Sequence, residues 1–344
     1  MTEGIDSSLA ATAAVTPAEK QGSPYLAAAP PLAWMAGAAA FADLILNRVL
    51  ILLGREAWST DALVRLGTWG SFARNLSVVS ALVALGFCLS SLSSPKSGLP
   101  FSARAGIASF GWLLVPIITL MTFLPAAWTR PELVILVAGL AHATILLLIL
   151  AGMHWRSSRP VAAALVLTLV AALSGIFSMV VTQVGERMYW EQSERLSNAF
   201  RWSGEIAYLA APIAIGIAIS IPWRELRGKT AIALSTLAAG FVAAAMIIWK
   251  HAVGQDLPDL LYGALRLDFL PDRDFILYAI PLSVGAAVTV AAILSKDSIC
   301  RQLGGALLLL LSAGYAPRTP SALLLTVLGV ALLARVGIAL AKRR

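Results

Sequence analysis

Residues 132–153 read ELVILVAGLAHATILLLILAGM, and this stretch decides the class of the protein. Apart from Glu132 at its start and His142 near its middle, every side chain in it is apolar, small or a hydroxyl. A helix rises about 1.5 Å per residue, so a segment of this length crosses a hydrocarbon core of about 30 Å. The stretch is therefore predicted to be a transmembrane helix.

Runs of the same kind recur along the chain. Hydrophobic residues make up 59% of the sequence and charged residues only 13%, whereas a soluble protein carries about a quarter charged residues. The predicted fold class is an all-α polytopic integral membrane protein with ten transmembrane helices. The predicted spans lie near residues 31–54, 75–94, 105–126, 132–153, 160–184, 204–222, 230–249, 275–295, 303–316 and 320–341.

The N-terminal stretch differs from the rest. Residues 1–24 are small and polar, and the acidic Glu3, Asp6 and Glu19 outnumber the basic Lys20. A secretory signal would begin basic and become apolar within a few residues. Residues 1–24 are predicted to be a disordered cytoplasmic tail, and residues 25–344 a single transmembrane helical domain.

The distribution of Lys and Arg predicts the orientation, because cytoplasmic loops are enriched in these residues. With ten spans, both termini and the loops after spans two, four, six and eight share one side. That side carries fourteen basic and five acidic residues, against eleven basic and twelve acidic on the other. Both termini are therefore expected in the cytoplasm. The same asymmetry accounts for the net charge of +8 without nucleic acid as a partner.

Three offsets of about 160–165 residues suggest a weak 5+5 inverted repeat of the kind common among transporters. Spans five and ten begin with similar runs at Pro160 and Pro320, spans four and nine end in leucine-rich runs followed by Ala-Gly, and the third span of each half holds a proline. The last two spans are also expected to form either a tight helical hairpin or a re-entrant pair.

Polar residues inside the predicted spans are the first candidates for a functional site. Asp43, Asn47 and Arg48 lie in the first span, with Asp43 near its middle and Arg48 as its nearest charge in sequence. Charged groups at such positions are costly, so Asp43 and Asn47 are expected to face the protein interior, and at least one of them to hydrogen-bond another helix or line a polar cavity. Arg48 is expected to pair with Asp43 if the helix bends. His142 is expected to bond a neighbouring helix or to carry protons. Arg335 is expected to extend toward the nearby membrane surface.

The outer face supplies a second set of candidates. The segments 55–74, 186–202 and 250–274 combine aromatic and charged residues, and 186–202 is predicted to be a helix along the membrane surface. An enzyme acting at the outer leaflet would use an acid or a histidine near this face. Its candidate residues are Asp61, Glu205 and His251. Cys88 and Cys300 form no metal-binding pattern with histidine, so no metal site and no cofactor are predicted.

Three functions remain open from the sequence. The leading hypothesis is a transporter or permease-like protein for a small or lipid-like solute, supported by Asp43 and by the mid-helix prolines Pro116, Pro212 and Pro281. The alternatives are a non-catalytic subunit or assembly factor of a membrane complex, and a membrane-embedded transferase. Composition favours a bacterial inner membrane, with the lipid bilayer and other membrane proteins or a second copy of the chain as partners.

Overall fold

The structure is a computed structural model that describes residues 24–44, 59–124, 130–153, 159–184, 192–200, 298–313 and 319–342, with a few isolated positions elsewhere. All regular secondary structure in these residues is helical. The helices are α1 (Pro24–Leu44), α3 (Thr60–Ser93), the 3₁₀ turn η3 (Pro95–Ser97), α4 (Phe101–Phe123), α5 (Pro131–Met153), α6 (Arg159–Val184), α11 (Ser298–Ala313) and α12 (Pro320–Lys342).

Four of the described helices, α3, α4, α5 and α12, are long and apolar enough to cross a membrane. Shorter apolar segments lie in α6 and α11. The chain is thus a helical membrane protein. The predicted spans 105–126, 132–153, 160–184 and 320–341 are confirmed as helices to within about four residues. The predicted spans 204–222, 230–249 and 275–295 fall outside the described residues, apart from a few positions.

The first predicted span is matched in part. Helix α1 runs from Pro24 to Leu44 and so begins seven residues before the predicted 31–54, because Pro30 and Pro31 lie inside it and do not prevent the helix from forming. Most of residues 45–58 lie outside the described residues, so the predicted place of Asp43 near the middle of a span stays a prediction. Of the predicted disordered tail, residues 1–24, all but Pro24 lie outside the described residues, and Pro24 begins α1.

Helix α3 is much longer than the predicted span 75–94. It has 34 residues, about 51 Å at the usual helical rise, and includes most of the predicted loop 55–74. The hydroxyl of Ser59 caps it by accepting a hydrogen bond from the backbone N–H of Ala62 at 3.3 Å. Asp61 lies in its first turn, where a carboxylate stabilises the positive end of the helix dipole.

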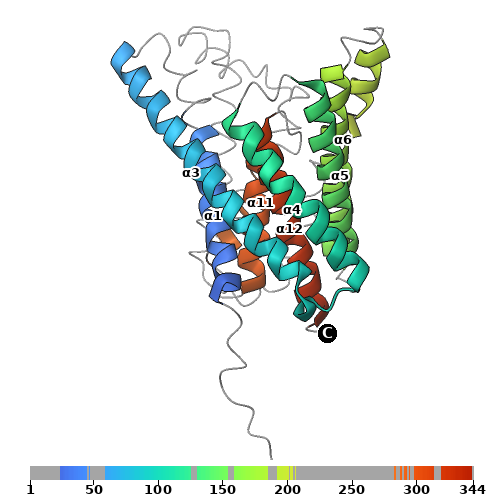
Figure 1. The fold of residues 1–344 in the computed structure, drawn as a ribbon. Coiled ribbons are helices and arrows are strands. Elements are labelled where there is room, and N and C mark those ends of the chain that lie inside the picture. The colour runs from blue at the N-terminus through green and yellow to red at the C-terminus, as the bar shows by residue number, and fades with distance from the viewer. Residues whose placement is uncertain are drawn as a thin grey trace, which may run out of the picture.

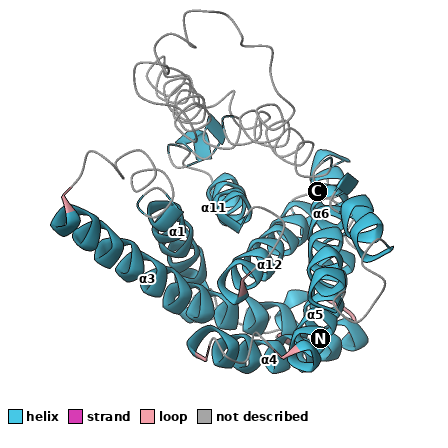
Figure 2. Cartoon of the chain, turned by 90° about the horizontal axis from the view of Figure 1, so that it is seen from above, coloured by secondary structure: helices cyan, strands magenta, loops and turns pink. Residues whose placement is uncertain are grey.

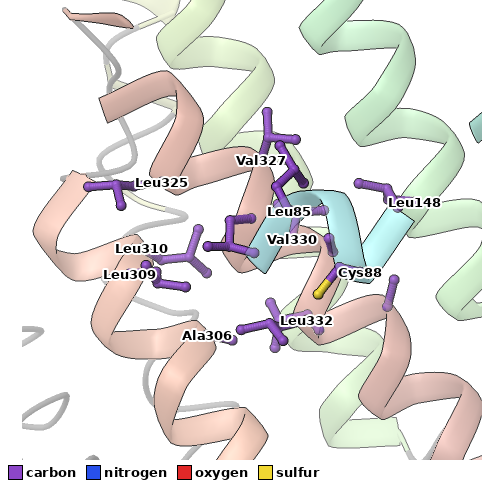
Figure 3. Packing of buried hydrophobic residues seen from close by; sticks show 14 of the residues in the cluster. Leu85, Cys88, Leu148, Ala306, Leu309, Leu310, Leu325, Val327, Val330 and Leu332 are labelled. Atoms are coloured by element: carbon purple, nitrogen blue, oxygen red, sulfur yellow. The ribbon is translucent and has the colours of Figure 1, made fainter. Parts of the chain in front are cut away.

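The helices form a bundle around α12, which packs against each of the other six described α-helices (Figures 1 and 2). Most of its apolar stretch, 83%, is buried inside the protein. The C-terminus of α12 lies at the same end of the bundle as the start of α1 (Figure 1). We call this the terminal end and the other the opposite end. Leucine, valine and alanine side chains from α3, α5, α11 and α12 fill the core (Figure 3).

Small residues let α12 approach its neighbours closely. A Cβ atom at Gly337 would lie 2.9 Å from the carbonyl oxygen of Gly152 in α5, and one at Gly329 would lie 2.7 Å from Leu310 in α11. In the same way Trp34 of α1 lies against Gly304 and Gly305 of α11, and its indole N–H donates to the carbonyl of Arg301 at 2.9 Å. Side chains at these positions would push the helices apart.

Two connections match the sequence in part. Helices α11 and α12 pack together as a hairpin, with Thr319 capping α12 through the N–H of Ala322. Helix α11 begins at Ser298, five residues before the predicted 303. Its 16 residues span about 24 Å, short of a full hydrocarbon core. The turn between α3 and α4 depends on Gly98, whose φ of 79° is a conformation that glycine adopts without strain.

The predicted surface helix 186–202 is corrected in its orientation. Residues 192–200 are helical, as expected. Their contacts run antiparallel along α6, since Ser197 hydrogen-bonds Ser178 at 2.9 Å and the Phe200 ring packs on Phe177 with ring centres 4.1 Å apart. The segment therefore runs alongside α6 instead of lying across its end, because Ser197 and Phe200 contact Ser178 and Phe177 of α6.

Candidate functional site

An ion pair joins α1 to α3. The Nε and Nη2 atoms of Arg74 donate to the two carboxylate oxygens of Asp43 at 3.1 and 3.4 Å. The carboxylate side chain is 20% exposed and the guanidinium side chain 54% exposed. Nearby, the buried hydroxyl of Ser77 donates to the carbonyl of Ala36 at 2.9 Å and fixes the register of the two helices. The prediction that Asp43 hydrogen-bonds another helix is confirmed, with Arg74 as the donor.

Arg74 was missed by the sequence reasoning because it was assigned to a loop. A signal was present: Asp43 and Arg74 have opposite charges near the ends of two consecutive apolar runs. Consecutive helices usually pack side by side, so such charges come together. The remaining first-span candidates, Asn47 and Arg48, lie outside the described residues. A pairing between Asp43 and Arg48 therefore stays a prediction.

His142 links α5 to α6. Its Nδ1 lies 2.7 Å from the carbonyl oxygen of Ala138 in its own helix, and its Nε2 lies 3.2 Å from the carbonyl oxygen of Leu173 in α6. The expected contact with a neighbouring helix is confirmed. A neutral ring donates to only one of these oxygens, whereas a protonated ring donates to both. Since both nitrogens face backbone carbonyls, the ring acts as a clamp between the two helices.

Arg335 lies on the central helix α12 and points into the bundle. Its Nη1 atom lies 4.0 Å from the sulfur of Cys88 in α3, and Cys88 is fully buried. Cys88 belongs to the packed cluster around α12 (Figure 3). The described contact of Arg335 is thus with Cys88, and the expectation that it extends toward the nearby membrane surface stays a prediction.

Arg104 is a second arginine near the terminal end, in the first turns of α4. Its Nε atom is buried and has no hydrogen-bond partner, and its guanidinium carbon lies 5.9 Å from the ring centre of Phe101. Arg74 pairs with Asp43, whereas the described residues show no carboxylate paired with the guanidinium group of Arg104 or of Arg335.

The predicted outer-face residues are not brought together among the described residues. Asp61 is exposed in the first turn of α3, while Glu205 and His251 lie outside the described residues. The proline argument also weakens, because Pro116 lies on an exposed face of α4 and does not face the core. The described part of the chain contains no group of three residues that could hold a metal ion.

The arrangement is thus a packed helical bundle with polar contacts at three levels. The ion pair lies toward the opposite end, the histidine clamp lies within α5 and α6, and the two arginines lie toward the terminal end. The guanidinium groups of the two arginines can bind an anion and neutralise its charge, since each presents a planar set of hydrogen-bond donors. Comparisons with family models, with curated proteins and with solved structures each found no match to this chain.

Proposed function

We propose that the protein is a permease-like carrier that moves a small or lipid-like solute across a bacterial inner membrane. The proposal includes ten spans with both termini in the cytoplasm. The observation that carries it is Arg335, a charged side chain on the most buried spanning helix, directed toward buried Cys88. An arginine costs about 2.5–3.5 kcal/mol at the centre of a span on insertion scales and less toward the end, where Arg335 lies, and charges retained within spans usually serve substrate or ion pathways.

The charges of the described residues support the orientation. Six basic residues and no acidic ones lie on the helix segments and turns of the terminal end, whereas four basic and four acidic residues lie toward the opposite end. The basic residues of the terminal end are Lys96, Arg104, Arg159, Arg301, Arg335 and Lys342. An excess of Lys and Arg favours the cytoplasm, so we assign the terminal end to the cytoplasmic side.

The chain path supports the number of spans. Helix α6 ends at the opposite end of the bundle, and α11 begins at the terminal end. We therefore propose that the intervening chain crosses an odd number of times. Three predicted apolar runs, 204–222, 230–249 and 275–295, supply three crossings and bring the total to ten. The antiparallel packing of residues 192–200 on α6 gives this return a starting point.

The inverted repeat receives mixed support. Its two halves must run in opposite directions, and α5 and α6 do run opposite to α11 and α12. However, α5 packs on α12, and the described residues hold no comparable contact between α6 and α11. We therefore propose that the repeat holds for the directions of the helices and not for the contacts between them.

A subunit role is the second candidate, and one observation favours it. Helix α3 is about 20 Å longer than a hydrocarbon core requires, and Val64, Trp69 and Phe72 are more than half exposed on its first half. Such a surface suits a partner in a membrane complex. The transferase stays a hypothesis: Asp61 lies on α3, while its other two candidate residues, Glu205 and His251, lie outside the described residues.

The test compares the distribution of solutes and lipids in cells that express the wild-type protein, Arg335→Gln or Arg335→Lys at equal abundance. We expect at least one solute or lipid whose distribution depends on the wild-type protein, is lost in Arg335→Gln and is partly kept in Arg335→Lys. An untargeted measurement of both compartments makes the experiment independent of a known substrate. If the distribution of no solute or lipid changes while the protein is abundant and folded, the carrier proposal is wrong and the subunit role gains support.

A further inference from the structure

The turn from α3 into α4 carries an arrangement that the carrier proposal does not use. Arg104 has a buried Nε atom with no hydrogen-bond partner. Since this Nε atom is enclosed by protein, a ligand outside the helices would reach the guanidinium group through its Nη atoms, which are not among the buried unpaired atoms of the described residues. Because Arg104 is never uncharged, the partner that fits best is an anion.

Phe101 indicates where that anion comes from. Its side chain is 77% exposed, and its ring lies 5.9 Å from the guanidinium carbon of Arg104. An exposed aromatic ring beside an arginine, at the end of a spanning helix, matches the boundary between acyl chains and headgroups. The ring can contact an acyl chain while the guanidinium contacts the phosphate of the same lipid.

The turn contains a basic residue, Lys96, which has an interaction of its own. The described residues from Ser77 to Phe123 include no Asp or Glu. Helix α4 also begins without a side-chain cap, so its first backbone N–H groups remain open to an acceptor. Basic sites of this kind between spanning helices bind anionic headgroups on the cytoplasmic side.

We propose that Arg104, together with Phe101 and the α3–α4 turn, binds the phosphate of an anionic phospholipid. The shared chemistry is a phosphate group held by the guanidinium fork, with the acyl chain against the aromatic ring. The site is independent of the carrier activity, which we assign to Arg335. It fixes the depth of α4 in the cytoplasmic leaflet.

Native mass spectrometry of the full-length protein tests this with phosphatidylglycerol, phosphatidylcholine and inorganic phosphate as separate probes. The expected result is retention of phosphatidylglycerol in preference to phosphatidylcholine. Arg104→Gln weakens it about tenfold, as expected from the loss of hydrogen bonds to a charged group. Arg104→Lys keeps the positive charge but loses the paired guanidinium donors, so its affinity for phosphatidylglycerol lies between those of the wild-type protein and Arg104→Gln. Arg65→Gln, an equal charge change in the first half of α3, leaves lipid binding unchanged.

Two outcomes overturn the proposal. The first is equal retention of phosphatidylglycerol by folded Arg104→Gln and wild-type protein. The second is full displacement of the lipid by millimolar inorganic phosphate, which assigns the site to a soluble anion. Arg335→Gln is expected to retain phosphatidylglycerol. The carrier proposal is therefore tested at Arg335 and the lipid site at Arg104, so that failure of one can be told from failure of the other.

Discussion

The crossing of α5 and α12 predicts opposite effects for two identical substitutions. A Cβ atom at Gly337 would lie 2.9 Å from the carbonyl oxygen of Gly152 and 3.4 Å from its carbonyl carbon. These are backbone atoms, so the contact cannot be relieved by rotating a side chain. Gly139, on α5, has no atom within 4 Å of such a Cβ. We expect Gly337→Ala to destabilise the protein and Gly139→Ala to stabilise it.

The magnitudes follow from two terms. Replacing glycine by alanine in a helix reduces the freedom of the unfolded chain and stabilises by about 0.4–1 kcal/mol. Overpacking of a tight contact costs about 1–3 kcal/mol. Gly139→Ala has only the first term, whereas Gly337→Ala has both. The two variants should therefore differ in free energy of unfolding by about 1–3 kcal/mol, with Gly337→Ala the less stable.

The measurement is reversible unfolding of the purified protein in mixed micelles, followed by tryptophan fluorescence. Both variants are measured in the same detergent composition, so that their unfolded states are comparable. Equal stability of the two variants, or a more stable Gly337→Ala, would refute the close approach of α5 to α12. In that case the central place of α12 in the fold would also be in doubt.

Two further predictions concern contacts of α1. Asp43→Asn and Arg74→Gln should show a coupling free energy of about 0.2–1 kcal/mol in a double-mutant cycle of unfolding, because the ion pair is partly exposed. Under the carrier proposal, Asp43→Asn abolishes transport while the abundance of the protein stays normal. Under the subunit role, the same substitution lowers the abundance. Trp34→Phe should lower the free energy of unfolding by about 0.5–1.5 kcal/mol through loss of the hydrogen bond to Arg301, and an unchanged stability would contradict that contact.

The sequence predicted the apolar helices well and their ends poorly. Helices α4, α5, α6 and α12 match predicted spans because apolar runs and membrane crossings follow from the same requirement, the avoidance of unpaired backbone groups in lipid. Helix α3 was cut short at 75, since hydropathy reports contact with lipid and not the continuity of a helix. Residues 60–74 are polar enough to look like a loop, yet Ser59 caps them as the first half of one long helix.

The candidate site was predicted in part. Asp43 and His142 were singled out as intramembrane polar residues, and each hydrogen-bonds a neighbouring helix. Arg74 and Arg104 were treated as loop charges, and Cys88 as a packing residue. Their importance arises from tertiary contacts between helices far apart in sequence, such as the 247 residues that separate Cys88 from Arg335. No local pattern contains that information.

The number and direction of the spans can be tested most directly with topology reporters at residues 228 and 262, within the part of the chain that connects α6 to α11. The proposed topology has an odd number of crossings there, because α6 ends at the opposite end of the bundle and α11 begins at the terminal end. The ten-span account predicts that a reporter at 228 is cytoplasmic and one at 262 is external, with a reporter at 98 cytoplasmic as the reference. If stable fusions at 228 and 262 report the same side, the connection does not cross three times as proposed, and the ten-span account is wrong.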